Sequence, residues 1–383
     1  MIAEFRIQGI DFAIDQSSGV GSSFKVESYP RSYYVDFTVG NNPSKNLIHA
    51  LMNEYDPILL MDQQIKGIYF RNNDIFKNIP TFQVNAEEKV KTIDTALEIV
   101  DFLYKNHATK ASMLFVIGGG ILQDLGSFSC AIYKRGIPWT YIPTTLVSQG
   151  DSCIGGKTAL NYNKTKNLLA LFSAPRKVII DVSYLKSLRN LDLMSGIGEI
   201  FRLCITGGFV SLDFFSNRLQ AFLDNVHEAT NQLISIALLV KRAVVEYDEF
   251  ELDVRRSMNY GHSFGHALEA LTSYRIPHGV GVTIGILVEN EISFQRGILD
   301  QKGRDYILRL GKQLVPERCK KILISLSLNG IIDLLRHDKK AEADLLKIAT
   351  LKQIGEMTFI DFPLNEKGEQ ELENAVLSII NEF

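Results

Sequence analysis

The sequence predicts two folded parts, a parallel α/β domain followed by an all-helical domain. Three observations support this prediction. The chain has 383 residues, more than one hydrophobic core usually organises. Between about residues 30 and 185, short apolar runs alternate with amphipathic helical stretches, a pattern typical of a parallel sheet. After about Ser187, long amphipathic stretches predominate, which indicates packed helices.

The first part is placed at residues 31–186, after an N-terminal extension at 1–30 that mixes Ser and Gly with few apolar positions. Its strands are predicted at 33–39, 57–61, 113–117, 139–143 and 177–181. Helices are predicted over 92–105 and 123–133, from their apolar periodicity. Gly118–Gly120, between a buried strand and a helix, predict a tight turn.

The second part is placed at 187–383. Its helices are predicted at 191–206, 211–224, 229–250, 260–273, 280–295 and 301–314. The segment 345–361 fits a helix or short strands equally well, and its structure is left open.

Composition excludes several classes of protein. The formal net charge of -3 argues against a nucleic-acid binder, which usually carries a basic excess. Apolar runs are too short to cross a membrane, and the N-terminal segment has no signal-peptide pattern. The four cysteines fit neither a CxxC pair nor a zinc-finger spacing, so reduced thiols in a cytoplasmic protein are expected.

Gly118–Gly120 are the first candidate ligand-binding element. Glycines after a buried strand let the backbone approach a pyrophosphate, and the next helix directs its amides there. The motif is not GxGxxG, and a simple strand-to-helix turn explains it equally well. Residues 143–167 combine Asp151, a Gly pair, Lys157 and Lys166 in one loop-like stretch, which favours a binding loop over a purely structural one.

A second candidate site is a cluster of histidines. His262 and His266 are spaced i,i+4, so both rings lie on one helical face, and His278 follows after a short turn. A single such histidine is more often a satisfied core residue, but three together indicate a metal site. A catalytic zinc takes three N/O ligands, and Glu199, flanked by apolar residues, is the best carboxylate candidate. A helix-surface glutamate is the alternative.

The order of motifs resembles the 3-dehydroquinate synthase family. The chain contains GGGxxxD, YKRG, PTTL, DSxIGGKT, KN, GEI and NxGHSxGH, and the resemblance extends from Asp62 to Lys340. It implies a Rossmann-like NAD-binding α/β domain, an all-α metal- and substrate-binding domain, and an active site in the cleft between them. It also implies NAD and zinc, or another divalent metal such as cobalt, as cofactors.

The resemblance also implies roles for individual residues. The metal ligands are Glu199, His262 and His278. Cofactor contacts are implied for Asp62, Gln64, Glu88, Lys91, Gly119, Gly120, Asp124, Thr144, Thr145, Val147, Asp151, Lys157, Lys166 and Ser187. The catalytic and substrate-binding set is Arg135, Asp151, Lys157, Asn167, Arg202, Lys241, Arg255, Asn259, His266 and Lys340, with Lys339 as the alternative to Lys340. Arg135 can serve the neighbouring subunit's site, which implies a homodimer.

This sequence departs from the family pattern at three places. Arg202 replaces a lysine three residues after the glutamate ligand, Gln64 stands where Asn is more frequent, and His278 is followed by Gly-Val-Gly-Val instead of Gly-Glu-Ala-Val. Asn259 and His266 are kept, whereas related cyclases with other substrates typically change them. We expect Arg202 to contact an anionic group of the substrate.

The implied activity is the cyclisation of 3-deoxy-arabino-heptulosonate 7-phosphate to 3-dehydroquinate with release of phosphate, a lyase step of the shikimate pathway and of aromatic amino acid biosynthesis. Three alternatives stay open. One is a paralogous cyclase with another sugar phosphate. The second is a polyol dehydrogenase of the glycerol dehydrogenase type, although Lys157, Lys241 and Arg255 favour an anionic substrate. The third is a non-catalytic NAD-binding descendant.

Overall fold

The computed structural model describes residues 2–15, 21–38, 42–52, 54–71, 74–163, 165–336, 341–342 and 344–383. The chain divides into two compact units. The sheet unit comprises Gly19–Leu188 and Thr230–Ser235, and the helical unit comprises Met1–Ser18, Arg189–Ala229 and Ile236–Phe383. In the described residues, no helix is long and apolar enough to span a membrane.

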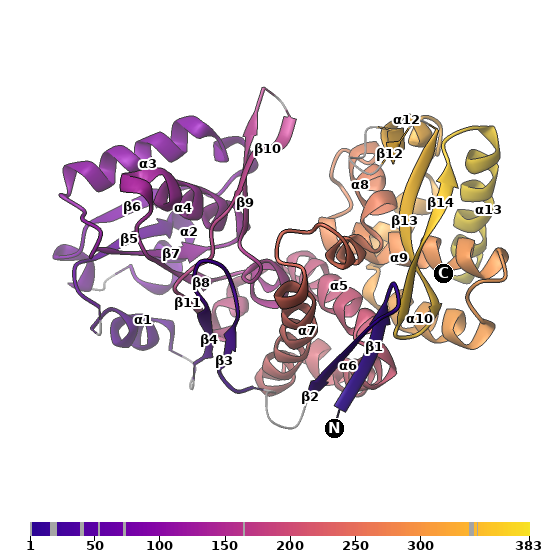
Figure 1. Cartoon of the computed structure of the whole chain (residues 1–383), viewed down its shortest axis with the longest axis horizontal. Helices are drawn as coiled ribbons and strands as arrows, with labels where there is room; N and C mark the ends of the chain where they lie inside the picture. Colours follow the sequence, from indigo (N-terminus) through magenta and orange to yellow (C-terminus); the bar gives the residue numbers. More distant parts are fainter. Residues whose placement is uncertain are drawn as a thin grey trace. The chain divides into compact units, whose positions relative to one another are not determined.

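A seven-stranded sheet forms the centre of the sheet unit (Figure 1). Its order is β3 (Phe24–Val26), β4 (Tyr33–Phe37), β11 (Lys177–Ile180), β8 (Trp139–Pro143), β7 (Met113–Gly118), β5 (Pro57–Asp62), β6 (Thr81–Val84). All neighbouring pairs are parallel except β3 with β4. The chain runs from β5 outward to β6 and then returns to β7 on the other side of β5, so the strand order reverses between β5 and β7.

Helices cover both faces of this sheet. They are α1 (Pro43–Met52), α2 (Gln63–Tyr69), α3 (Ile93–Lys105) and α4 (Gly120–Ile132). Leu59 and Phe115 pack with α1 in one core cluster, whereas Leu60 and Val116 lie against Gly126 of α4. Every residue of β7 is buried, because a central parallel strand has a helix layer on each side. A hairpin of β9 (Lys157–Tyr162) and β10 (Thr165–Phe172) packs beside α4.

The helical unit is built around α9 (His278–Gln295), whose residues from Gly279 to Ser293 are all buried. Helices α5 (Asn190–Thr206), α8 (His262–Leu271), α10 (Gln301–Leu314) and α13 (Glu366–Glu382) contact it. The other helices are α6 (Gly208–Leu223), α7 (His227–Tyr247), α11 (Glu317–Ile324) and α12 (Ile331–Arg336). Because α9 is mainly apolar and buried on all sides, it depends on such a bundle for its stability.

A five-stranded sheet completes the helical unit, in the order β12 (Ala341–Glu342), β13 (Leu345–Gln353), β14 (Glu356–Pro363), β1 (Ile2–Ile7), β2 (Ile10–Asp15). The segment left open in the sequence is thus a pair of antiparallel strands, β13 and β14. The predicted N-terminal extension contains β1 and β2 of this sheet and β3 of the seven-stranded sheet, and β1 pairs in parallel with β14. The two-part fold class is confirmed, but the second part is not purely helical.

Local sequence patterns do not predict this second sheet, because its strands come from the two ends of the chain and pair across nearly its whole length. β1 alternates exposed and buried residues, a strand signal, but its partner β14 lies more than 300 residues away in sequence. The four cysteines, Cys130, Cys153, Cys204 and Cys319, are buried and form no disulfide in the described structure.

Candidate functional site

Three helices of the helical unit bring the predicted metal ligands together. Glu199 lies in the middle of α5, His262 is the first residue of α8, and His278 is the first residue of α9. Oε1 of Glu199 lies 2.9 Å from Nε2 of His278 and 3.6 Å from Nε2 of His262. A carboxylate oxygen and two imidazole nitrogens therefore face one point.

Glycines allow this close approach of the three helices. A Cβ on Gly279 would overlap the carbonyl oxygen of Ser195 in α5, and one on Gly285 would overlap the carbonyl oxygen of Gly261 at the start of α8. A Cβ on Gly281 would lie 3.2 Å from the carbonyl oxygen of Gly265. Gly281 belongs to the Gly-Val-Gly-Val run that departs from the family pattern, and it lies where α8 and α9 pack tightly. Backbone contact brings side chains from α5, α8 and α9 within reach of one ion.

Charges around Glu199 explain how its carboxylate is buried. Its exposed fraction is 1%, and Nε of Arg202 donates a hydrogen bond of 2.7 Å to Oε2. Burial alone would raise the pKa of Glu199, but the Arg202 guanidinium and the rings of His262 and His278 outweigh it and hold that pKa well below its ordinary value. Glu199 is therefore ionised, as a metal ligand must be.

The pKa values of the two histidines are shifted in opposite directions. Burial holds the pKa of His262 well below its ordinary value, against the raising influence of Glu199. Burial would also lower the pKa of His278, but the neighbouring carboxylates of Glu199 and Glu269 outweigh burial and raise that pKa to about 10. Without a metal, His278 is thus the cation that faces Glu199.

One observation tests whether these residues fit a metal. Oε1 of Glu199 is buried and accepts no hydrogen bond within the described part of the chain, although Nε2 of His278 lies only 2.9 Å away. A buried carboxylate oxygen without a hydrogen bond is costly, and a divalent cation would compensate it. Two histidines and one glutamate are a known ligand set for zinc with an open position. The residues fit the ion.

His266 is an alternative third ligand. One ring nitrogen from each of His262, His266 and His278 lies within 4.8 Å of those of the other two. His266 is exposed, however, so water reaches its ring, whereas Oε1 of Glu199 is buried, accepts no hydrogen bond from the described residues and lies 2.9 Å from Nε2 of His278. We therefore favour Glu199 as the ligand and His266 as a proton-transfer group beside the metal.

Other predicted substrate residues of the helical unit lie in neighbouring elements. Lys241, in α7, and Arg255, in the short turn η6 (Val254–Asn259), are 7% and 2% exposed. The Arg255 guanidinium donates to the Glu249 carbonyl oxygen, and Nδ2 of Asn259 donates to Oε1 of Glu251 at 3.1 Å. Arg202 is 2% exposed and points to Glu199. Lys339 and Lys340 lie outside the described residues.

In the sheet unit, the predicted cofactor residues gather at the carboxyl ends of adjacent strands. Asp62 ends β5, Gly119 and Gly120 follow β7, and Thr144 and Thr145 follow β8. The sheet order reverses between β5 and β7, and ligands of open α/β sheets bind at such a reversal. A Cβ on Gly120 would meet nothing within 4 Å, so space for a ligand is open beside the start of α4.

A buried polar network supports this edge of the sheet. Nζ of Lys91 donates to Oδ2 of Asp124 and to Oδ1 of Asn167, at 2.7 Å each. Oδ1 of Asp124 accepts the backbone amide of Ala159 at 3.0 Å, which ties α4 to β9. Burial raises the pKa of Asp124, against the lowering influence of Lys91. Glu88 accepts a hydrogen bond from Asn161 at 2.8 Å.

The remaining predicted residues of the sheet unit lie in the segments around this network. Thr145 Oγ1 lies 2.7 Å from Ser148 Oγ, and Ser187 Oγ donates to the Tyr184 carbonyl oxygen at 3.1 Å. Arg135 has a positive φ of 63° and is exposed. The others occupy α2, the turn after β8, β9 and β10; they are Gln64, Val147, Asp151, Lys157 and Lys166.

Glu269 belongs to the histidine cluster but was not predicted as a site residue from the sequence. Its Oε1 lies 2.8 Å from Nδ1 of His278, and its exposed fraction is 8%. Glu269 lies on the same face of α8 as His262 and His266, at the i+7 and i+3 positions. That spacing was the available signal.

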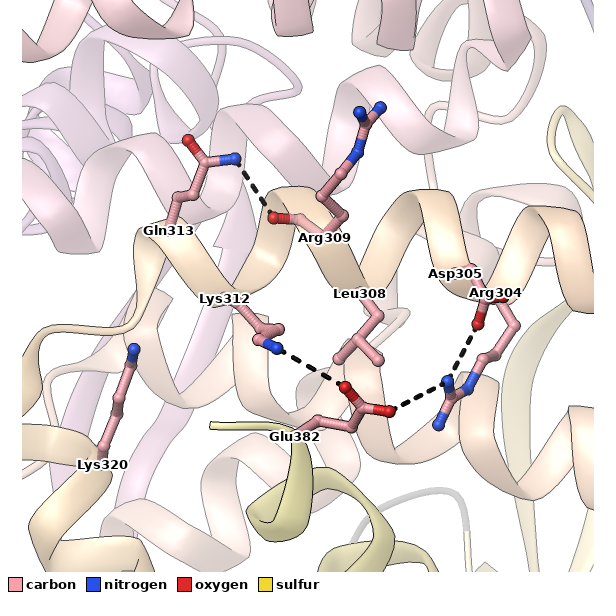
Figure 2. A pocket seen from close by; sticks show the side chains of 8 residues that line it. All are labelled: Arg304, Asp305, Leu308, Arg309, Lys312, Gln313, Lys320 and Glu382. Atoms are coloured by element: carbon pink, nitrogen blue, oxygen red, sulfur yellow. Dashed lines mark hydrogen bonds and ion pairs between the residues drawn. The ribbon is translucent and has the colours of Figure 1, made fainter.

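A groove of about 700 Å³ elsewhere in the helical unit has a different character (Figure 2). It is lined by charged side chains of α10, α11 and α13, and none of its lining residues belongs to the predicted site. Glu382 forms ion pairs with Arg304 at 3.7 Å and Lys312 at 3.5 Å across it. These pairs neutralise much of the positive charge.

Comparisons with known proteins agree with the geometry. The family models "3-dehydroquinate synthase N-terminal" and "3-dehydroquinate synthase C-terminal" match residues 81–195 and 196–341. The chain is 31% identical to the 3-dehydroquinate synthase of Dictyoglomus turgidum, over 84% of this chain and 90% of that one. It is 33% identical to that of Pelagibacter ubique, over 90% and 95%.

Solved structures share the fold at lower identity. A 2-deoxy-scyllo-inosose synthase complexed with carbaglucose-6-phosphate, NAD⁺ and Co²⁺ has a TM-score of 0.75 and 17% identity, covering 94% of this chain and 100% of its own. The 2-epi-5-epi-valiolone synthase of Streptomyces hygroscopicus, with NAD⁺ and Zn²⁺ bound, has a TM-score of 0.77 and 20% identity, over 93% and 99%. A probable glycerol dehydrogenase from Sinorhizobium meliloti has a TM-score of 0.57 and 11% identity, over 91% and 96%.

Removal of one ligand tests the metal site. We expect His262→Ala to weaken Zn²⁺ or Co²⁺ binding by at least about 100-fold, because losing a ligand costs more than the roughly 10–100-fold loss of an outer partner. His266→Ala should keep the metal and lose activity. The exposed His49 provides the control His49→Ala, which should change neither. Metal content after dialysis measures metal binding in all three variants. A His262→Ala protein that keeps its full metal content would refute the assignment.

Metal binding should be linked to protons at His278. Its pKa rises from 6.5 to about 10 in the metal-free protein, so its contribution to stability is complete below pH 6.5 and is lost as the pH rises through 10. A metal must displace this proton, so apparent affinity should rise about tenfold per pH unit between about pH 7 and pH 9. Calorimetry in buffers of different ionisation enthalpy should show release of about one proton at pH 8. A pH-independent affinity in that range would contradict the prediction.

Proposed function

The chain belongs to the 3-dehydroquinate synthase family, and from this premise we propose that it is an NAD- and metal-dependent sugar phosphate cyclase. Its proposed reaction converts 3-deoxy-arabino-heptulosonate 7-phosphate to 3-dehydroquinate and phosphate. The observation that carries this proposal is the convergence of Glu199, His262 and His278 on one point, with His266 beside them.

The cofactor part of the proposal rests on the sheet unit. Gly119 and Gly120 would accept a pyrophosphate at the start of α4, where nothing lies within 4 Å of the Cβ position of Gly120. Asp62 at the end of β5 would contact the adenosine end. When bound, NAD⁺ accepts and later returns a hydride, and the divalent metal polarises hydroxyl groups of the substrate.

The residues of this chain would supply binding and proton transfer. Lys241, Arg255, Lys157 and Asn167 are the residues for which the family resemblance implies substrate contacts, and carboxylate and phosphate groups suit charge-assisted hydrogen bonds with such side chains. An imidazole nitrogen of His266 would accept and return a substrate proton. A homodimer in which Arg135 reaches the neighbouring subunit's site is part of the proposal.

A paralogous cyclase with another substrate is the second candidate. Arg202 favours it, because a guanidinium is wider than an ammonium and prefers planar partners, so it alters the space beside the metal ligand. The glycerol dehydrogenase type is less favoured, since the cationic set Lys157, Lys241 and Arg255 has no use with an uncharged polyol.

Phosphate release is the direct test of the reaction. With 3-deoxy-arabino-heptulosonate 7-phosphate, NAD⁺ and Co²⁺ or Zn²⁺, we expect one phosphate for each 3-dehydroquinate and no growth in NADH absorbance, because the hydride returns. Other sugar phosphates and glycerol serve as controls. Phosphate release from a different sugar phosphate alone would favour the paralogue, and stoichiometric NADH from a polyol would favour the dehydrogenase.

A glycine substitution tests the cofactor site. Gly120→Val should weaken NAD⁺ binding about 100-fold, or about 2.7 kcal/mol, because its side chain would occupy the open space beside the turn. Gly119→Val is less informative, since its Cβ would already lie 2.9 Å from Cγ2 of Thr145. Gly67→Val is the matched control, as Gly67 also lies in a helix with nothing within 4 Å of its Cβ position. Fluorescence titration with NADH measures the binding, and wild-type affinity in Gly120→Val would move the cofactor elsewhere.

A further inference from the structure

Four side chains of alternating charge form a chain through the metal site. Nε of Arg202 lies 2.7 Å from Oε2 of Glu199, Oε1 of Glu199 lies 2.9 Å from Nε2 of His278, and Nδ1 of His278 lies 2.8 Å from Oε1 of Glu269. They come from α5, α9 and α8. Arg202, Glu199 and Glu269 are 2%, 1% and 8% exposed, so the two ends of the chain are buried.

Glu199 and His278 each have two atoms that could bind a metal, and the residue at each end of the chain contacts one of the two. Arg202 bonds Oε2 of Glu199, and Oε1 accepts no hydrogen bond from the described residues. Glu269 faces Nδ1 of His278, which leaves Nε2 as the atom turned to Glu199. His262 follows the same rule with a backbone partner, since its Nδ1 lies 3.2 Å from the carbonyl oxygen of Tyr260. One donor atom per ligand thus faces the common point.

We propose that Arg202 and Glu269 are positioning residues of the metal site. Arg202 holds Oε2 of Glu199, so that Glu199 presents a single oxygen to the metal. Glu269 holds Nδ1–H of His278, so that this ring presents Nε2. The inference rests on the metal site of the proposed function and adds two residues that act through the ligands.

Burial supports a positioning role for both residues. A guanidinium that is 2% exposed and bonded to Glu199 acts first on the ligand, which differs from the expectation that Arg202 reads a substrate anion. Arginine suits this position because it stays charged and its planar fork fixes the carboxylate orientation. A carboxylate on the outer nitrogen of a ligating histidine fixes the ring and its tautomer in the same way.

Cobalt binding tests Glu269. Co²⁺ is added to the metal-free full-length protein, its Kd is measured by competition with a chelator, and the visible spectrum is recorded. Glu269→Ala should weaken Co²⁺ binding about 10–100-fold, because the ring of His278 can then rotate or change tautomer. Glu269→Gln keeps the volume and one acceptor oxygen, so its Kd should lie between those of Glu269→Ala and the wild type.

The Co²⁺ spectrum tests Arg202. In Arg202→Met both oxygens of Glu199 become available, so the coordination number should rise and the visible bands should lose intensity, with a weaker Kd. Arg202→Lys restores a positive charge without the planar fork and should recover part of the affinity. A residue with only a structural role would change stability and leave the spectrum of the bound Co²⁺ unchanged.

Glu291→Gln is the matched control. Glu291 is a buried carboxylate of α9, 3% exposed and bonded to Nε of Arg304 at 2.8 Å, so its loss removes a buried ion pair away from the metal ligands. It should lower the melting temperature and keep the wild-type Co²⁺ Kd and spectrum. This separates a loss of stability from a loss of ligand orientation.

Wild-type Co²⁺ Kd and spectra in folded Glu269→Ala and Arg202→Met would overturn the inference. If either variant fails to unfold cooperatively, Glu269→Gln and Arg202→Lys decide, and wild-type values in both would overturn it equally. The proposed function survives those results as long as the wild type binds metal and releases phosphate. A wild type that does neither would refute the proposed function and this inference together.

Discussion

The burial of the Glu199 carboxylate is the constraint on which the site depends. A carboxylate that is 1% exposed loses its hydration, and each of its oxygens needs a partner. Arg202 is the partner of Oε2, and the rings of His262 and His278, with the metal of the proposed function, would compensate Oε1. Replacing any of these partners would leave the buried charge of Glu199 uncompensated. The three helices must therefore pack closely enough for the partner side chains to reach it. The glycines of α9 serve this requirement, because they let backbone atoms of α5 and α8 lie directly against it.

The sheet unit solves a different problem, which is to leave open a space that a phosphate group can enter. Parallel strands end at one edge, so residues as distant in sequence as Asp62 and Thr145 lie on neighbouring strands. The missing side chain at Gly120 leaves the start of α4 accessible. Lys91 and Asp124 link α4, η2 (Glu88–Val90) and the hairpin through an ion pair and hydrogen bonds. Such buried polar pairs specify orientation at a cost in desolvation, and they are common beside binding sites.

Family membership and local departures carry different information about function. The predicted ligands and strand-end residues are those that the family resemblance implies, and the proposed function rests on them. Arg202 differs, and its guanidinium lies against the metal ligand, where a change of side chain affects coordination as well as substrate space. The groove of α10, α11 and α13 shares no lining residue with this site, and in it Glu382 forms ion pairs with Arg304 and Lys312 (Figure 2).

The sequence by itself determined the two-part fold class, five strands of the seven-stranded sheet and the main helices, because apolar periodicity and strand-end glycines are local signals; β3 and β6 were not predicted. It also predicted Glu199, His262 and His278 as metal ligands, from histidine spacing and motif order, and the structure brings these three side chains together. Only the tertiary structure decided that residues 2–15 complete a sheet with β13 and β14, because that pairing joins the two ends of the chain. It alone revealed Glu269 as the partner of His278 and Glu199 as the partner of Arg202. These contacts depend on how three helices pack, which no local pattern encodes.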